Sequence, residues 1–330
     1  MRITNKMLAN NYLRDMGNNL NNMQNLNNQL SSGKEIRRPS DNPYKVARSM
    51  QLNTDINSNG QYNENIKDTT NWLDTTDESL GQITNVVQRV RELMVSSGNA
   101  AYGSSQRGAI ADEINERISE LSQIMNSNFD GKYVFGGSKT TSKPTVVTKN
   151  PLTGCNEISL VDKSGNKLPL NSSDPIEINQ INMIGSKLST EVSQGVSIDY
   201  NVNALDILKF NNENGAQVDM MSLFNEITKN LVSADKTDNL KLTNENLSQI
   251  DNVVTNLLKI RAEVGSKQNR MESAQTKNED ENYNMTDILS QTEDIDFTNK
   301  TIEFSMAQTV YQAALQVSSQ VLPKTLLDYL

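Results

Sequence analysis

An apolar residue recurs every seven positions along the segment from Pro43 to about Ser97: Ile66, Leu73, Leu80, Val87 and Met94. Ile83 and Val90 fill the second position of the same stripe, and Asp77 interrupts it. This spacing is typical of a coiled-coil seam. At a rise of about 1.5 Å per residue, the helix would reach about 80 Å, which is longer than an ordinary globular domain. The pattern therefore predicts a long helix that packs against another helix along its length.

Thinner seams occupy the two ends of the chain. Residues 1–30 carry Leu13, Met16, Leu20, Met23 and Leu30 at coiled-coil spacing, among many asparagines. Asparagine is a poor helix former, because its amide competes for backbone hydrogen bonds. A last amphipathic segment after Asp287 carries Ile302, Met306, Val310, Ala313, Val317 and Val321. Neither end can bury its stripe alone, so we expect the two ends to pack together; a disordered N-terminal tail is the alternative.

A charged elbow, residues Leu30–Arg48 (LSSGKEIRRPSDNPYKVAR), joins the first helix to the second. Gly33 is expected to end a helix in the left-handed conformation. Pro39 and Pro43 exclude a continuous helix through the stretch. Asn42 then fits as an N-cap, with Pro43 as the first helical residue. The elbow is either an assembly element that meets neighbouring copies or a simple linker between helices.

Three further stretches are predicted to be helical. One carries Ile110, Ile114, Ile118, Leu121 and Met125, and we expect Asp130-Gly131 to end it. Helix returns at Val218–Val232. A long helix near Thr243 has the seam Leu247, Ile250, Val254, Leu257, Arg261, Val264 and Met271. The charged Arg261 stands at a position that otherwise takes apolar residues.

Between these helices, residues 132–217 contain short β-type runs separated by Gly, Pro, Asn and Ser. Asp162–Lys167 (DKSGNK) is expected to be a hairpin turn. The predicted fold class is α+β: an elongated rod of long coiled-coil-like helices from both chain ends, with a β-rich central module. The predicted domains are a terminal assembly domain (1–42 and 286–330), a helical rod (43–137 and 218–285) and a β-rich insertion (138–217).

Composition excludes several classes of function. The chain has no histidine and one cysteine, Cys155, which removes histidine-based triads, histidine metal sites and an intrachain disulfide. A net charge of −9 argues against a nucleic-acid partner. No run approaches the roughly 20 apolar residues of a membrane span, and residues 1–30 lack the apolar core of a secretory signal. We expect no cofactor, no metal and no catalytic residue.

Three stretches could suggest a binding site, but the sequence supports none of these sites. As a calcium loop, Asp162–Lys167 lacks the length and the terminal glutamate. Residues 131–139 lack the Gly-Lys-Ser/Thr that a phosphate loop requires. The acidic run 278–282 (NEDEN) is expected to be a solvated helix face.

Several stretches resemble the flagellin superfamily. They are MRIT, QLSSGKEIRRPSDNPYKVAR, RGAIADEINERISEL, GKYVFGGSKT, IRAEVGSKQNRMES and the closing LLDYL, and with their helical context they cover roughly the first 140 and last 90 residues. The PSDNP form of the elbow and the LLDYL ending look like the hook–filament junction members, whereas QNRMESA is also filament-like. The middle of the chain carries little of the resemblance beyond GVSIDYNV.

The resemblance implies an extracellular structural protein of the bacterial flagellum, exported through the flagellar type III pathway without a cleaved signal peptide. It implies assembly into a helical ring of copies. Junction members join a hook-side associated protein to flagellin and have a dedicated export chaperone. The alternative within the family is a short flagellin that forms the filament itself. Outside the family, an enzyme on a coiled-coil scaffold lacks a catalytic constellation, and a surface-binding role is open for the β-rich insertion alone.

We expect subunit assembly to use the terminal seams and the elbow. The candidate residues are Leu13, Met16, Leu20, Met23, Leu30, Lys34, Arg37, Arg38, Asp41, Ile302, Met306, Val310, Val317 and Val321. We also expect both ends to be disordered in the free monomer and to become helical on assembly.

Overall fold

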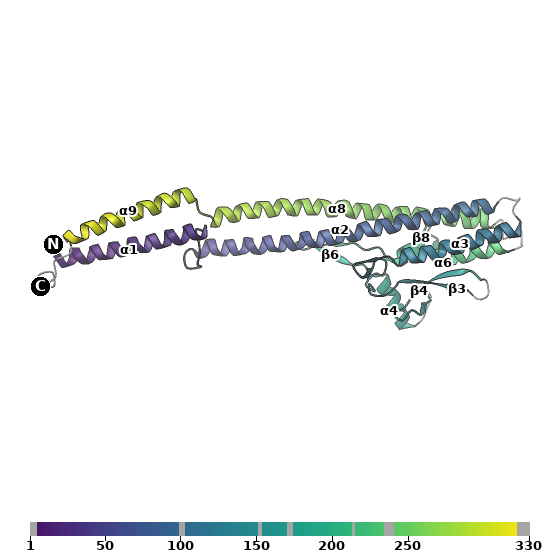
Figure 1. Ribbon diagram of the computed structural model, residues 1–330. Helices are drawn as coiled ribbons and strands as arrows, with labels where there is room; N and C mark the ends of the chain where they lie inside the picture. Colours follow the sequence, from purple (N-terminus) through teal and green to yellow (C-terminus); the bar gives the residue numbers. More distant parts are fainter. Residues whose placement is uncertain are drawn as a thin grey trace. The chain divides into compact units, whose positions relative to one another are not determined.

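The computed structural model describes residues 5–98, 103–150, 154–169, 174–212, 215–233 and 241–321. Long helices come from both ends of the chain, and a strand-rich region comes from the middle (Figure 1), which confirms the predicted α+β class. The chain divides into two compact units. One comprises Met1–Gly60 with Glu279–Leu330, and the other comprises Gln61–Asn278.

The first unit is built from the helices of the two chain ends. It contains α1 (Asn5–Ser32), the start of α2 (Pro43–Ser97), the end of α8 (Leu247–Glu293) and α9 (Phe297–Val321). As predicted, the two ends pack together: α1 and α9 lie side by side (Figure 1). The last helix starts later than Asp287. Asp296 caps it, because its carboxylate accepts hydrogen bonds from the backbone N–H groups of Thr298 and Asn299.

The second unit has its core along α2 and α8. The predicted seven-residue seam of α2 is fully buried, as are Ile83 and Val90. On α8 the buried side chains are Ile250, Val253, Leu257, Ile260, Val264 and Met271. Val254, predicted for the seam, is only partly buried, and Val253 takes its place. A π-helical turn, η1 (Leu242–Asn246), leads into α8.

Two shorter helices complete this core. In α3 (Ser104–Met125) the residues Ile114, Ile118, Leu121 and Met125 are buried, and they pack near α6 (Met220–Val232). The expectation that Asp130-Gly131 ends α3 is wrong. The helix stops at Met125, because the side chain of the next residue, Asn126, bonds to the backbone of Thr145. Asp130 and Gly131 instead have φ values of 49° and 75° in the turn of a hairpin, a conformation that this dipeptide favours.

The described strands form small antiparallel sheets in the middle of the chain. They pair as β1 (Asn128–Phe129) with β2 (Lys132–Tyr133); β4 (Asn156–Val161) between β3 (Thr145–Lys149) and β5 (Lys167–Leu168); β6 (Ser189–Ser193) with β7 (Val196–Asp199); and β8 (Lys209–Asn211) with β9 (Gln217–Asp219). The predicted turn at Asp162–Lys167 connects β4 to β5. Two helices, α4 (Pro175–Ile184) and α5 (Ala204–Leu208), lie between the strands.

The strand-rich region extends beyond the predicted insertion at both edges. Strands begin at Asn128 and end at Asp219, whereas the predicted limits are 138 and 217. The two compact units divide after Gly60 and after Asn278, inside the continuous helices α2 and α8. The predicted three-part division into assembly, rod and inserted domains remains a prediction.

Candidate functional site

The first candidate surface is the contact between α1 and α9. On α1 the inward side chains recur at three- and four-residue intervals, and Leu26 at this contact is only 6% exposed. Tyr12 donates its hydroxyl hydrogen bond to the carbonyl of Ala314, and the amide of Asn19 donates to the carbonyl of Ala307 at 3.3 Å. The small alanines of α9 let α1 approach closely. This face therefore closes within one copy of the chain.

The predicted seam residues of α1 fall on different sides of the helix. Met16, Met23 and Leu30 are partly buried, on the side that carries Leu26. Leu13 and Leu20 are about half exposed. Sequence reasoning left Leu26 out of the seam, although it completes the three-four spacing between Met23 and Leu30.

The predicted seam of α9 faces outward. Met306 and Val310 are 58% and 59% exposed, and Ile302 and Val317 are about half exposed. The side of α9 toward α1 is a second stripe, which sequence reasoning missed: Phe304, Ala307, Tyr311 and Ala314 are partly buried. In the sequence, this stripe is visible as aromatic and alanine residues that recur at intervals of three and four positions. Val321 ends α9, and its side chain lies outside the described residues.

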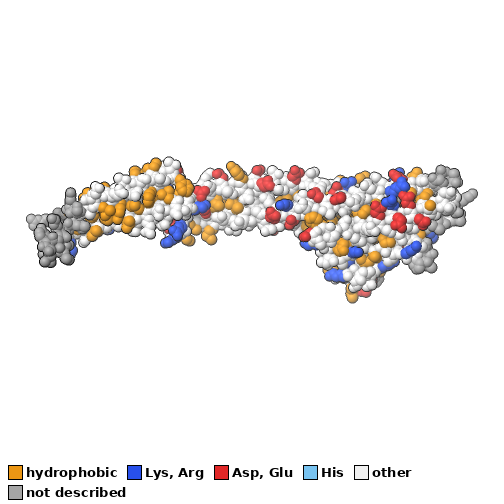
Figure 2. Space-filling view, in the orientation of Figure 1, with side chains coloured by type: hydrophobic (Ala, Val, Ile, Leu, Met, Phe, Trp, Pro, Cys, Tyr) orange, Lys and Arg blue, Asp and Glu red, His pale blue; other side chains and the backbone are white. Residues whose placement is uncertain are grey.

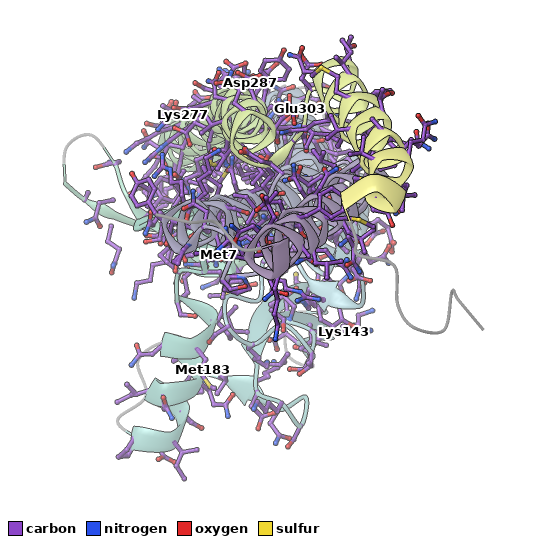
Figure 3. The ribbon with its side chains drawn as sticks, turned by 90° about the vertical axis from the view of Figure 1, so that its left-hand side faces the viewer. Met7, Lys143, Met183, Lys277, Asp287 and Glu303 are labelled. Atoms are coloured by element: carbon purple, nitrogen blue, oxygen red, sulfur yellow. The ribbon has the colours of Figure 1, made fainter. Side chains whose placement is uncertain are left out.

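We give the name outer stripe to nine exposed apolar residues of α1 and α9. Figure 2 shows hydrophobic side chains gathered over α1 and α9, and Figure 3 looks along these helices and labels Met7, one member. Part of it is a shallow apolar groove on α9 lined by Ile302, Met306 and Val310. The outer stripe comprises Met7, Leu8, Leu13, Leu20, Ile302, Met306, Val310, Leu315 and Val317. Exposed apolar patches of this kind mark contact surfaces.

The second candidate surface is the elbow after α1. Gly33 ends α1 with φ 71°, as predicted, and its N–H donates to the carbonyl of Gln29 at 2.8 Å. The carbonyl of Gly33 accepts a hydrogen bond from the N–H of Ile295 at 3.1 Å. The ring of Phe297 would lie 3.5 Å from a Cβ at Gly33. The elbow is thus fastened to the break between α8 and α9.

Lys34 strengthens this connection. Its ammonium lies 2.7 Å from the carboxylate of Glu293 and 2.9 Å from that of Asp294. The hydrogen bonds to these two carboxylates raise the pKa of Lys34. Hydrogen bonds from Ser290 and then Lys34 lower the pKa of Asp294. Lys34 therefore has partners inside its own chain, whatever it meets in an assembly.

Asp41 shapes the turn before α2. Its carboxylate accepts backbone hydrogen bonds from Arg38 at 2.9 Å and Arg37 at 3.2 Å, and these bonds lower its pKa. The next residue, Asn42, accepts from the N–H of Lys45 and caps α2, as predicted. Asp41 and Asn42 thus hold the elbow conformation through local bonds.

The guanidinium groups of Arg37 and Arg38 remain directed to solvent. Both side chains are exposed, and neither forms an ion pair within the part of the chain that the structure describes. They border a polar groove of about 480 Å³ between the elbow and α1, together with Gln24, Asn25, Asn28 and Gln29. Of the predicted elbow residues, these two are the ones available to a neighbouring molecule.

The other motifs carry no site. Lys139 of the supposed phosphate loop is buried and donates hydrogen bonds to the carbonyls of Val161 and Lys143. Cys155 is buried and is not in a disulfide. Within the described ranges, no cluster of three acidic or cysteine side chains could hold a metal ion, and none of the helices has a stretch apolar and long enough to cross a bilayer.

Comparisons with known proteins match both helical ends. The family model of the bacterial flagellin N-terminal helical region matches residues 3–140, and that of the C-terminal helical region matches residues 247–330. These are the stretches that contribute α1, α2, α3, α8 and α9.

The individual proteins that match this chain are also flagellar proteins. Flagellar hook-associated protein 3 of Escherichia coli (strain K12) is 23% identical over 317 residues, 95% of each chain. A flagellin of Clostridium tyrobutyricum is 34% identical over 140 residues, which are 42% of this chain and 37% of that protein. The flagellar junction protein FlgL from Legionella pneumophila has the same fold, with a TM-score of 0.53 at 14% identity, covering 76% of this chain and 100% of that one. The chain therefore belongs to the flagellin superfamily of flagellar structural proteins, which are not enzymes.

Proposed function

We propose that this chain assembles with copies of itself into a helical ring at the junction between the flagellar hook and filament. The observation that carries the proposal is the outer stripe of α1 and α9. It leaves Met306, Val310 and other large apolar side chains about half exposed, although the inner face of the same helices is closed. Full burial of such a side chain contributes about 1.5–3 kcal/mol, so covering the stripe favours association.

A second copy is a suitable cover for this surface. Every copy presents the same apolar residues on both helices, so a repeated contact between copies can bury the stripe of each. The solvent-directed Arg37 and Arg38 add a polar contact beside the apolar one. Lys34 and Asp41 support this surface by holding the elbow in place.

The junction is favoured over the filament by the PSDNP form of the elbow and by the fold shared with the junction protein FlgL from Legionella pneumophila. The extent of the sequence match does not separate the two roles, because hook-associated protein 3 of Escherichia coli matches over 95% of both chains and a flagellin of Bacillus subtilis matches over 97% of this chain and 96% of that protein. The partners that this role requires are a hook-side associated protein, flagellin and an export chaperone. The location is extracellular, reached by export without a cleaved signal peptide.

The test has a biochemical and a cellular part. The purified full chain should form only short assemblies in light scattering and electron microscopy. Cells without the protein should keep hooks and lose filaments, and shed flagellin into the medium. Long filaments from the purified chain alone would instead support the flagellin alternative. Normal filaments in the deletion strain would contradict both roles.

A further inference from the structure

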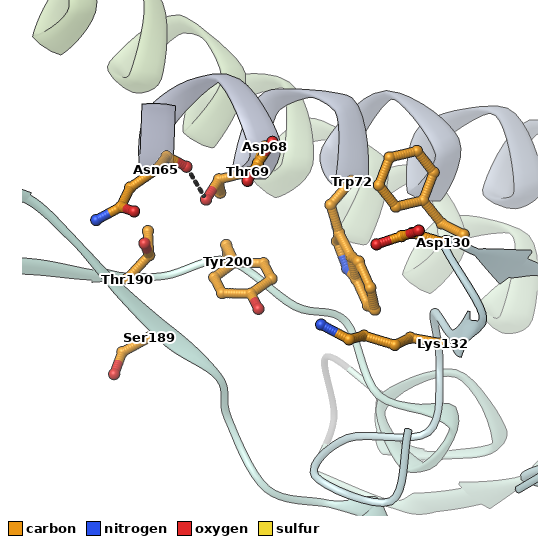
Figure 4. A pocket seen from close by; sticks show the side chains of 10 residues that line it. Asn65, Asp68, Thr69, Trp72, Asp130, Lys132, Ser189, Thr190 and Tyr200 are labelled. Atoms are coloured by element: carbon orange, nitrogen blue, oxygen red, sulfur yellow. Dashed lines mark hydrogen bonds between the residues drawn. The ribbon is translucent and has the colours of Figure 1, made fainter. Parts of the chain in front are cut away.

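A pocket of about 630 Å³ in the unit of residues 61–278 is not used by the proposed function (Figure 4). Helix α2 contributes Asp68 and Trp72 to its wall. The β1–β2 hairpin contributes Phe129, Asp130 and Lys132. Tyr200, just after β7, completes the polar and aromatic lining considered below.

Trp72 is the buried donor of this pocket. Its side chain is 6% exposed, and Nε1 has no hydrogen-bond partner among the residues that the structure describes. Phe129 and Tyr200 hold the indole edge to face, at centroid distances of 6.1 and 5.9 Å. A buried N–H without an acceptor costs free energy, so an acceptor supplied from outside would be favourable.

Two further donors lie around the same space. Figure 4 shows the ammonium of Lys132 and the hydroxyl of Tyr200 on the side of Trp72 that carries its indole nitrogen. Neither group forms a side-chain hydrogen bond or ion pair with another described residue. Burial raises the pKa of Tyr200, so its hydroxyl keeps its proton at neutral pH. A carboxylate, with two oxygens and about four acceptor positions, matches an N–H, an O–H and an ammonium together.

We propose that this pocket binds a carboxylate, supplied in the assembled particle by an aspartate or glutamate side chain of a second copy of the chain. This rests on the proposed self-assembly. The chain has 40 acidic and 31 basic residues, so carboxylates are the charges that a neighbouring copy most often presents. Asp68 and Asp130 also line the pocket and repel an anion. A free carboxylate therefore binds weakly, whereas one held nearby by other contacts benefits from a high effective concentration.

Trp72 supplies the readout, since it is the only tryptophan of the chain. The full chain, kept unassembled by dilution and checked by light scattering, is titrated with sodium acetate against sodium chloride at equal ionic strength. Acetate should change the tryptophan emission saturably, and chloride should not. Lys132→Gln should weaken acetate binding about tenfold or more, because a charge-assisted hydrogen bond is lost.

Asp130→Asn provides a change of opposite sign. Removing this negative charge should strengthen acetate binding, and asparagine tolerates the φ of 49° at this position. A general loss of structure could not weaken binding in one variant and strengthen it in the other. Lys149→Gln, an exposed change on β3 away from the pocket, should leave acetate binding unchanged.

Assembly provides the second arm. Raising the protein concentration until light scattering reports assembly should change the tryptophan emission without acetate. Added acetate should then compete with the carboxylate of the second copy for the pocket. An acetate response equal to that of chloride, or unchanged in Lys132→Gln, overturns the carboxylate site. An acetate response with no emission change on assembly overturns the second copy as its source. If the unmodified chain binds acetate but never assembles, the proposed function and the source both fail while the chemistry of the pocket stands.

Discussion

Asp77 of α2 and Arg261 of α8 form a two-pronged ion pair that links these two helices of the larger unit. Nε of Arg261 lies 2.9 Å from Oδ1 of Asp77, and Nη2 lies 3.0 Å from Oδ2. Each residue, read in its own helix, is a charged interruption of an apolar seam. Each side chain is the hydrogen-bond partner of the other, and the hydrogen bonds that Arg261 donates to the Asp77 carboxylate raise the pKa of Arg261.

The pair predicts a measurable coupling. Both side chains are more than a third exposed, so solvent screening limits the loss in Asp77→Ala or Arg261→Ala to about 1 kcal/mol of unfolding free energy. The double variant Asp77→Ala with Arg261→Ala should lose less stability than the sum of the two single variants, because the second substitution removes a charge that has already lost its partner. Urea unfolding followed by Trp72 fluorescence measures this. Additive losses across the four proteins of the cycle would contradict the coupling.

The outer stripe predicts a loss of assembly without a loss of folding. Met306→Asp with Val310→Asp should raise the protein concentration needed for assembly by at least about tenfold, since burial of two large side chains is lost. Helix content by circular dichroism should stay the same, because both positions are exposed. Gln308→Asp, an exposed change on the same helix, is the matched control. Equal assembly of both proteins would remove the stripe from the interface.

The elbow predicts a salt-dependent contribution to assembly. Arg37→Ala with Arg38→Ala should weaken assembly about tenfold at low salt and less at high salt, where exposed charges are screened. Arg48→Ala changes an exposed arginine in the helical last part of the elbow, after Pro43, and should have little effect. Sedimentation and a motility assay report both variants. Intact motility and assembly in the double variant would mean that the elbow is only a linker.

Lys139 predicts a pH dependence of stability. Burial lowers the pKa of Lys139 in the folded chain, so the unfolded chain binds more protons at pH values between the two pKa values. The cost of burying the charge is therefore complete below the folded pKa and fades as the pH rises toward 10.5, the ordinary value. Lys139→Met removes two hydrogen bonds as well as the charge, so the prediction concerns the pH dependence: the stability of the parent relative to this variant should rise as the pH rises toward 10.5. Unfolding curves at several pH values measure the difference. A relative stability of the parent that is constant or falls with pH would contradict this account.

The packing of the terminal helices predicts their behaviour in the free monomer. In α1 only Ala9 and Leu26, and in α9 no residue with a described side chain, are more than nine-tenths buried. Few buried contacts mean low local stability. Hydrogen exchange in a verified monomer should be fast in α1 and α9 and slow along the core of α2. Strong protection of both terminal helices in the monomer would contradict folding on assembly.

The sequence alone predicted the long helices and how the elbow closes, but not the helix α4 (Pro175–Ile184), which lies in the stretch expected to be strands. The seven-residue repeat from Ile66 to Met94 became a fully buried seam, because helix geometry places such residues on one face whatever lies opposite. Gly33 and Asn42 acted as predicted, since a cap depends on backbone groups only a few residues away.

Tertiary structure decided which faces meet. The sequence offered two apolar stripes on α9, and the larger side chains of Ile302, Met306 and Val310 suggested the wrong one for the contact with α1. The contact uses Ala307 and Ala314 instead, which accept hydrogen bonds from α1 through their carbonyls. Asp77 and Arg261 likewise found each other across 184 residues of sequence. Periodicity reports the faces of one helix, whereas the choice of partner depends on shape and charge on both helices, which no single segment contains.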